Sequence, residues 1–275
     1  MPSRSVGRNA PKSYRSLFIS DLHLGARACR VGPVQEFLRG VEAETIYLVG
    51  DIFDLWHGGR LHWTPRHDAV LGDLRARAAR GTRVVYLPGN HDAAMRTPGA
   101  RVEGWEICEA ALHRAADGRS YLVLHGDQCD PRFLRWHLMT RLGSRIDASM
   151  RQVDGWMRRR AGLTDWERSF IDRIYAWSYN MLAMGDGFET KLTKLAEAAG
   201  ATGVICGHSH KPGVRTHGQM TYANCGDWVD SLTALVEDFD GRLQLLAYER
   251  VPVPASRPSS GTSAEGGALA GGAAT

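Results

Sequence analysis

Short apolar runs, separated by polar and helical stretches, constrain the fold of this chain more than any other feature. They are rich in β-branched and aromatic residues, which favours β-strands, and they cover residues 16–20, 45–49, 83–87, 120–124, 202–206, 221–225, 231–237 and 242–248. A helix is predicted after Thr64-Pro65, which supplies an N-cap and a proline at the first helical position. Strands that first alternate with helices and then follow one another predict an α/β fold, with mixed β-sheets in layers flanked by helices.

One long stretch, residues 131–199, interrupts this alternation. Its apolar residues recur at helical spacing, as in Phe170, Ile171, Ile174, Trp177 and Met181. We interpret the stretch as a helical insertion or cap on a single domain that spans 15–254. The polar and basic residues 1–14 and the low-complexity residues 255–275 are predicted to be disordered tails.

The composition is that of an ordinary globular protein of 275 residues, with 43% hydrophobic and 23% charged residues and a formal net charge of only +4. So weak a charge does not indicate a nucleic-acid partner, and nothing in the sequence indicates an obligate protein partner. Five widely spaced cysteines without a C-x-x-C pair argue against a disulfide framework and favour a reducing compartment. Without an apolar leader or an apolar stretch of about 18 residues, the chain is expected to be cytoplasmic.

Polar side chains follow the ends of five predicted strands, which is where α/β folds gather their sites. The residues concerned are Asp21 and His23, Asp51 and Asp54, Asn90-His91-Asp92, His125 and Asp127, and His208 and His210. Any one of these loops could be an ordinary turn, and an isolated Asn-His-Asp is more typical of a turn than of a site. Five such loops in one chain predict a metal site.

The residue types indicate which metals would bind. Carboxylates, imidazoles and an asparagine oxygen, without cysteine, suit Mn²⁺, Fe²⁺ or Zn²⁺. Seven candidate ligands are too many for one ion and fit two ions that share a carboxylate; they are Asp21, His23, Asp51, Asn90, His125, His208 and His210. Asp54 and Asp127 are interpreted as residues that hydrogen-bond the loops, and His113 as a surface or supporting residue.

The series D-x-H, G-D-x-x-D, G-N-H-D, H-G-D and G-H-S-H, in this order over roughly residues 16–230, resembles the calcineurin-like metallophosphoesterase superfamily. The resemblance implies that superfamily's layered sandwich and two divalent ions, with Mn²⁺ the first choice and Fe²⁺ or Zn²⁺ as alternatives. One ion would be held by Asp21, His23 and His210, the other by Asn90, His125 and His208, with Asp51 bridging both. By the same resemblance His91 would be the catalytic histidine that acts on the phosphoryl oxygens or the leaving group, and Asp92 would fix its orientation.

Two segments, 20–25 (SDLHLG) and 47–56 (YLVGDIFDLW), resemble more narrowly the UDP-2,3-diacylglucosamine diphosphatases of lipid A synthesis. This resemblance implies hydrolysis of the pyrophosphate of a nucleotide-linked lipid to UMP and 2,3-diacylglucosamine 1-phosphate. It also implies peripheral contact with the inner-membrane surface. His91 departs from that branch, whose well-characterised members carry arginine there, and matches the wider superfamily.

Arginines and tryptophans in the predicted helices of 131–199 suit an anionic lipid surface or a cavity for acyl chains, although a plain helical subdomain would show the same pattern. The alternative function is a metallophosphoesterase that acts on soluble nucleotides or other phosphodiesters. A DNA nuclease would need a long basic groove, which the sequence does not indicate. A non-enzymatic scaffold is disfavoured because all seven candidate ligands are present.

Overall fold

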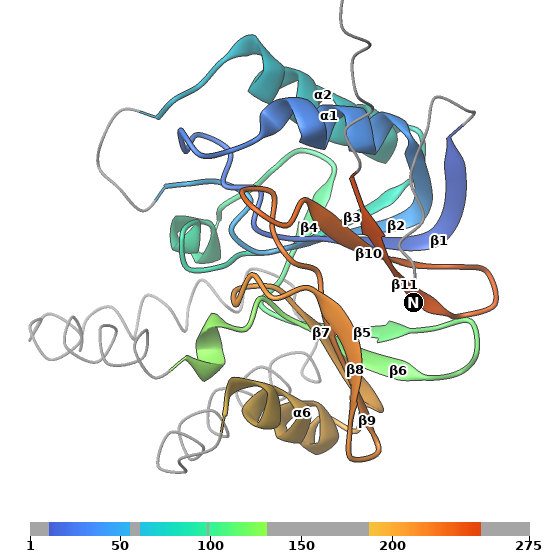
Figure 1. The fold of residues 1–275 in the computed structure, drawn as a ribbon. Helices are drawn as coiled ribbons and strands as arrows, with labels where there is room; N and C mark the ends of the chain where they lie inside the picture. Colours follow the sequence, from blue (N-terminus) through green and yellow to red (C-terminus); the bar gives the residue numbers. More distant parts are fainter. Residues whose placement is uncertain (1–10, 56–60, 98, 131–186, 249–275) are drawn as a thin grey trace, which may run out of the picture.

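Two β-sheets stacked face to face form the centre of the computed structural model, which describes residues 11–55, 61–97, 99–130 and 187–248 (Figure 1). The first sheet has six strands in the order β11-β10-β1-β2-β3-β4. Strands β1 to β4 are parallel, whereas β10 is antiparallel to β1 and β11 to β10. The strands are β1 (Lys12–Ile19), β2 (Val41–Val49), β3 (Arg83–Leu87), β4 (Trp105–Ile107), β10 (Thr233–Glu237) and β11 (Leu243–Ala247).

The second sheet has five strands in the order β5-β6-β7-β9-β8. Its central strands β6, β7 and β9 are parallel to one another, and the edge strands β5 and β8 are antiparallel to their neighbours. The strands are β5 (Ala111–Arg114), β6 (Ser120–Val123), β7 (Gly203–Cys206), β8 (Gly213–His217) and β9 (Met220–Asn224).

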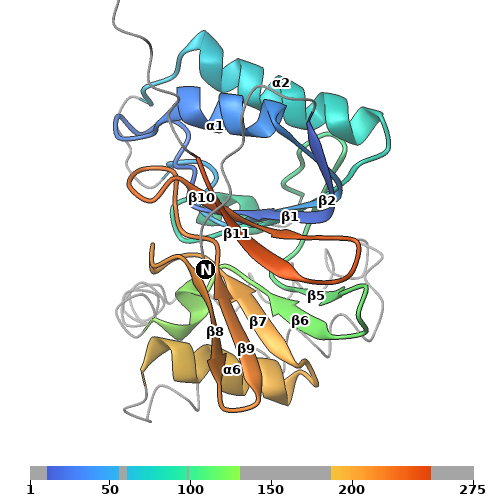
Figure 2. The ribbon, with the colours of Figure 1, turned by 45° about the vertical axis from the view of Figure 1, so that its right-hand side comes forward.

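Helices cover the outer face of each sheet (Figures 1 and 2). The first sheet is covered by α1 (Val31–Arg39) and α2 (Pro65–Ala79), and the second by α6 (Phe188–Ala198). Two short 3₁₀ turns, η1 (Ala93–Arg96) and η2 (Asp127–Cys129), follow β3 and β6. No described helix combines the length and the apolar character that crossing a membrane requires.

Three apolar layers hold these elements together, and β2 shows how one strand serves two of them. Because successive strand residues point to opposite faces, Ile46 and Leu48 pack into the cluster beneath α1 and α2. Tyr47 and Val49 pack into the cluster between the sheets. This double burial explains why β2 ends in an almost uninterrupted apolar run rather than a polar–apolar alternation.

The layered α/β architecture and all eight predicted strands are confirmed, as is the helix after Thr64-Pro65. Three strands and α1 were not predicted. Strand β4 has only three residues, and β8 is almost wholly exposed, so neither reads as an apolar run. Strand β5 carries only one buried residue, His113.

Two predicted boundaries differ from the elements of the structure. Strand β1 begins at Lys12, inside the predicted tail 1–14, and Lys12 pairs with Val41 of β2. Its first residues are polar and exposed, so the apolar pattern does not reveal them. Helix α6 lies within the predicted insertion 131–199, yet it packs on β7 and β9 as a layer of the core.

Other predictions about these regions stay predictions. The helices expected in 131–186, the tail 255–275 and the end of the domain at 249–254 lie outside the described residues.

Candidate metal centre

The predicted site residues meet where five strands of the two sheets end. Strands β1, β2 and β3 of the first sheet lead into Asp21, Asp51 and Asn90, respectively. Strands β6 and β7 of the second sheet lead into His125 and His208. Because these strands are parallel within each sheet, their carboxyl ends lie at one edge of the sandwich, and their loops converge there.

The backbone at this edge is strained in an unusual way. In the part of the chain that the structure describes, six residues other than glycine have positive φ, and five belong to the predicted ligand set: Asp21, His23, Asp51, His208 and His210. Their φ values lie between 47° and 64°, a left-handed conformation that side chains with a Cβ rarely adopt. Such strain persists where the surrounding structure fixes it, and it concentrates at functional sites.

Glycines let the loops approach one another closely. A Cβ on Gly207 would lie 2.5 Å from Oδ2 of Asp21, and one on Gly89 would lie 2.3 Å from Oδ1 of Asp51. Both distances are far below van der Waals contact, so a larger residue at either position would displace a predicted ligand.

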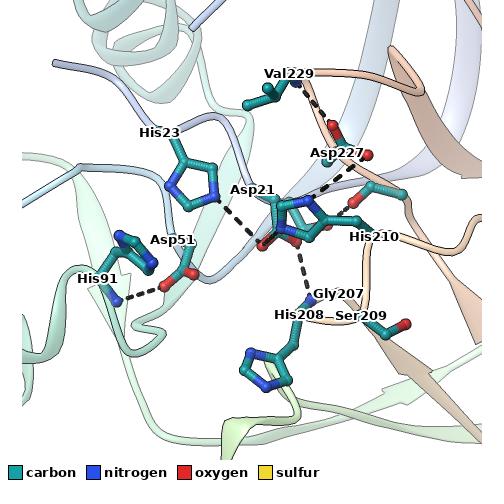
Figure 3. Close-up of polar contacts among 12 residues, drawn as sticks. Asp21, His23, Asp51, His91, Gly207, His208, Ser209, His210, Asp227 and Val229 are labelled. Atoms are coloured by element: carbon teal, nitrogen blue, oxygen red, sulfur yellow. Dashed lines mark hydrogen bonds and ion pairs between the residues drawn. The ribbon is translucent and has the colours of Figure 1, made fainter. Parts of the chain in front are cut away.

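A first group of possible ligands consists of Asp21, His23 and His210, whose nitrogen and oxygen atoms lie within 4.8 Å of one another. The carboxylate of Asp21 is the centre of the group (Figure 3). Its Oδ1 lies 3.2 Å from Nε2 of His210 and 3.8 Å from Nε2 of His23. Its Oδ2 accepts the backbone N–H of His208 at 3.0 Å, which fixes the carboxylate's orientation.

A second group consists of Asp51, His125 and His208. Oδ2 of Asp51 lies 3.4 Å from Nε2 of His125. The side-chain oxygen of Asn90 completes the group, since it lies 3.2 Å from Nε2 of His125 and 3.0 Å from Nδ1 of His208. A third trio, His23, Asp51 and His91, shares Asp51 with this second group and His23 with the first. Asp51 therefore lies between the two groups, as a bridging carboxylate would.

The chemistry of the second group fits a bound cation. Nδ1–H of His125 donates to the carbonyl oxygen of Val49 at 3.0 Å, so the neutral ring directs the lone pair of Nε2 into the site. There it faces the Asp51 carboxylate and the oxygen of Asn90. Electron-rich atoms facing one another in a buried site repel unless a positive charge lies among them.

The pKa of His125 points the same way. Burial lowers this pKa, but the negative charge of Asp51 and the hydrogen bond to it outweigh burial and raise the pKa to about 10. The residues present therefore fit a divalent cation, which would replace the proton that this imidazole otherwise holds.

His91 lies beside the two groups and contacts Asp54. Its Nδ1 lies 2.8 Å from Oδ1 of Asp54, and its backbone N–H donates to Oδ1 of Asp51 at 2.7 Å. The imidazole stands edge-on to His23, with 4.6 Å between the ring centroids. Together with Asp51, Asp54 and Asn90, it lines a cavity of about 320 Å³. A ligand in this cavity would contact His91 and both groups at once.

The predicted role of Asp92 was wrong. This fully buried carboxylate accepts the backbone N–H groups of Ile52 at 2.7 Å and Gly89 at 2.5 Å, and the hydroxyl of Tyr86 at 2.5 Å. It therefore fastens the loop after β2 to the loop after β3. The carboxylate that contacts the His91 ring is that of Asp54.

The interpretation of Asp127 as a residue that hydrogen-bonds the loops agrees with its contacts. Its buried carboxylate forms a bidentate ion pair with Arg96, in which Oδ1 and Oδ2 each lie 2.9 Å from a guanidinium nitrogen. Arg96 also donates to the carbonyl oxygen of Pro88 at 2.7 Å. Arg96, which no sequence motif marks, thus connects the loop that carries His125 to the loop that carries Asn90.

Several known proteins are similar to this chain. A UDP-2,3-diacylglucosamine hydrolase from Xanthomonas campestris pv. campestris is 26% identical over 248 residues, which cover 82% of this chain and 96% of that protein. Another from Aromatoleum aromaticum is 29% identical over 78% of this chain and 87% of its own length. Vacuolar Protein Sorting 29 from Cryptosporidium parvum aligns over 84% of this chain and 94% of its own, with a TM-score of 0.42 and 13% identity.

The family profile described as calcineurin-like phosphoesterase matches residues 14–212, which include every predicted ligand and His91. Members of this family hydrolyse phosphoesters with a dinuclear metal centre, for which the two groups around Asp51 supply candidate ligands. The chain therefore belongs to the calcineurin-like phosphoesterase family.

Proposed function

We propose that this metal-dependent hydrolase cleaves the pyrophosphate of UDP-2,3-diacylglucosamine and releases UMP and 2,3-diacylglucosamine 1-phosphate. The observation that carries the proposal is the position of Asp51 between two ligand groups, with His91 beside the same cavity. That arrangement suits the displacement of one phosphate oxygen by water. The choice of substrate is supported by relatives that carry the name UDP-2,3-diacylglucosamine hydrolase.

The metal ligands are assigned as two sets that share Asp51. One set is Asp21, His23 and His210, and the other is Asn90, His125 and His208. Mn²⁺ is the proposed ion, with Fe²⁺ or Zn²⁺ as alternatives, because imidazole, carboxylate and amide ligands suit all three. When bound, two such ions polarise the phosphoryl oxygens and lower the pKa of the attacking water.

His91 is assigned the proton transfer. Asp54 holds Nδ1 of the ring, so contact with the phosphoryl oxygens or with the leaving oxygen is assigned to Nε2. The backbone N–H of His91 binds Asp51, so the position of the imidazole is coupled to that of the bridging carboxylate. A proton donated to the departing oxygen of UMP or of the sugar phosphate would offset the charge that develops there.

The substrate also bears on where the protein acts. The two acyl chains of such a lipid anchor it in a bilayer, so we extend the proposal to peripheral association with the cytoplasmic face of the inner membrane. His91 keeps a second function open, since its G-N-H-D motif resembles that of the wider superfamily rather than that of the lipid branch. That second function is hydrolysis of soluble nucleotides or other phosphodiesters.

The test is a substrate comparison with the purified full chain loaded with Mn²⁺. UDP-2,3-diacylglucosamine in mixed micelles and a soluble dinucleoside pyrophosphate are each incubated with the enzyme, and products are identified by chromatography and mass spectrometry. We expect UMP and the lipid 1-phosphate from the first substrate and slow turnover of the second. Rapid cleavage of the dinucleotide with the lipid untouched would replace the lipid function by the soluble alternative, and Asp51→Asn is the inactive control.

A further inference from the structure

We propose that Asp130 is a positioning residue of the metal centre, which fixes the ring orientation and proton position of His208. Oδ2 of Asp130 lies 3.1 Å from Nε2 of His208, whereas the other ring nitrogen, Nδ1, lies near Oδ1 of Asn90 and would be the one to hold a cation. The inference rests on the dinuclear centre proposed above and assigns a residue that neither the sequence motifs nor the ligand groups include.

The two histidines of the second group present different nitrogens to the site. His125 keeps its proton on Nδ1, where the carbonyl oxygen of Val49 can only accept a hydrogen bond, and turns Nε2 inward. Nδ1 of His208 lies 3.0 Å from Oδ1 of Asn90, so to bind a cation together with that oxygen it must offer a lone pair, which requires the opposite tautomer, with the proton on Nε2. Asp130 provides the acceptor that this tautomer requires.

The surroundings of the pair make the contact specific. Asp130 is 8% exposed, and the side chain of His208 is 13% exposed, so water competes little for the hydrogen bond. Phe188 of α6 and His125 pack against the His208 ring, with centroid distances of 5.8 Å and 5.1 Å. With its ring faces packed and its backbone held at φ 64°, His208 has little freedom to turn another nitrogen toward the site.

A carboxylate behind a ligating imidazole does two things. It holds the ring in place, and its charge makes the opposite nitrogen a stronger electron donor. Removal of such an outer partner typically weakens metal affinity about 10–100-fold. We therefore expect Asp130→Ala to weaken one of the two metal sites by about that factor and to leave the site around Asp21 nearly unchanged.

The experiment measures metal affinity and the histidine protons directly. Zn²⁺, which is diamagnetic, is titrated into the metal-free full chain against a competing chelator, and long-range ¹H–¹⁵N spectra of the loaded protein report which ring nitrogen carries a proton. In the unsubstituted protein we expect Nε2–H on His208 and Nδ1–H on His125. In Asp130→Ala the Nε2 proton of His208 should exchange with water too fast to be observed, while the Nδ1 proton of His125 should remain observable.

Matched variants separate positioning from folding. Asp73→Ala removes a carboxylate on α2 that accepts a 2.8 Å hydrogen bond from Arg77, outside the site, and should leave both Zn²⁺ affinities unchanged. Asp130→Asn keeps an acceptor oxygen without the charge. It should therefore retain the His208 tautomer yet bind Zn²⁺ more weakly than the unsubstituted chain, and it decides the matter if Asp130→Ala does not fold. Saturating metal should restore the kcat of both Asp130 variants.

Two results would overturn the assignment. One is an Asp130→Asn variant that binds Zn²⁺ as tightly as the unsubstituted chain. The other is an Asp130→Ala variant in which both Zn²⁺ affinities and the Nε2 proton of His208 are unchanged. Failure of the dinuclear centre itself looks different. In that case the unsubstituted chain would bind fewer than two Zn²⁺ ions, and Asp130 would have no centre to support.

Discussion

Nδ1 of His91 lies 2.8 Å from Oδ1 of Asp54, and this contact joins the loop after β3 to the loop after β2. The same two loops are joined a second time, because the backbone N–H of His91 donates to Asp51. Asp51 and Asp54 are three residues apart and contact the same histidine: Asp51 accepts the backbone N–H of His91, and Asp54 contacts its ring. The G-D-x-x-D motif therefore couples the proposed bridging ligand to the proposed proton donor.

Substitution of His91 should affect the chemical step more than the metal. General acid–base catalysis typically contributes about 10²–10⁴-fold, so His91→Ala should lower kcat by a factor in that range. Metal content, measured by elemental analysis, should stay near two ions per chain because His91 is assigned to neither ligand set. A loss of metal in this variant would make His91 a ligand.

The contribution of Asp54 should depend on His91. Asp54→Asn should lower kcat by a smaller factor than His91→Ala, and it should add little in the His91→Ala background, because its effect passes through that ring. Asp92→Asn is the contrasting variant. It should mainly lower the free energy of unfolding, since Asp92 binds Gly89, Ile52 and Tyr86 rather than the ring. If the changes in activation free energy of Asp54→Asn and His91→Ala simply added in the double variant, the two residues would act separately.

Asp51→Asn should remove metal and activity together. The substitution keeps the size of the side chain and removes the negative charge that would be shared by two cations in a site where Asp51 is only 2% exposed. Elemental analysis should find fewer than two ions per chain, with phosphoesterase activity near background. Two bound ions with near-normal turnover would show that Asp51 does not bridge. Asp230→Asn, which changes a carboxylate without a predicted role in the site, is the control.

Much of the fold and of the ligand set could be predicted because both follow from local patterns. Strands buried on both faces, such as β2, are continuous apolar runs, and their polar ends mark the site. Strand β8 could not be found this way, because its exposed residues owe their strand conformation to pairing with β9.

The partner of His91 was beyond the same method. Asp54 and Asp92 are both close to the site in sequence. Which of them contacts the ring depends on where the backbone N–H groups of Ile52 and Gly89 point. Those groups donate to the carboxylate of Asp92, and the carboxylate of Asp54 contacts the His91 ring. Likewise, nothing in the sequence indicated that His113 is buried and bonded to a carboxylate 124 residues away.

Loss of Arg96 should destabilise the fold at the site. Asp127, whose side chain is 2% exposed, would then be a buried carboxylate without its cation, and breaking a buried pair in this way costs about 3–5 kcal/mol. Urea unfolding of the metal-free chain should therefore show a lower midpoint for Arg96→Ala. Arg101→Ala, at an exposed arginine, should stay within about 0.5 kcal/mol of the unsubstituted chain. Equal midpoints for the two variants would show that the Arg96–Asp127 pair does not support the loops.

A buried carboxylate far from the ligands should make stability depend on pH. Glu237 of β10 accepts hydrogen bonds from His113 at 2.8 Å and from the backbone N–H of Ala116 at 2.8 Å, and it pairs with Arg15 at 2.7 Å. Burial raises the pKa of Glu237, but the hydrogen bond from His113 and those from its other partners outweigh burial and lower the pKa to about 2. The charged form of Glu237 is therefore the one that the folded protein stabilises.

The sign follows from the two pKa values. In the unfolded chain a glutamate has a pKa of about 4.3, so above that pH the stabilisation that charged Glu237 provides is fully present. As the pH falls toward about 2, the unfolded chain takes up a proton that folded Glu237 does not, and the stabilisation, of the order of 3 kcal/mol, is lost progressively.

Urea unfolding of the metal-free chain at pH 6, 4 and 3 should accordingly show a gap in the free energy of unfolding between the unsubstituted protein and Glu237→Gln that narrows as the pH falls. Glu106→Gln removes the exposed partner of Arg83 and should show no comparable gap at any of these pH values. A gap between the unsubstituted protein and Glu237→Gln that stays constant from pH 6 to pH 3 would show that Glu237 contributes through packing rather than through its charge.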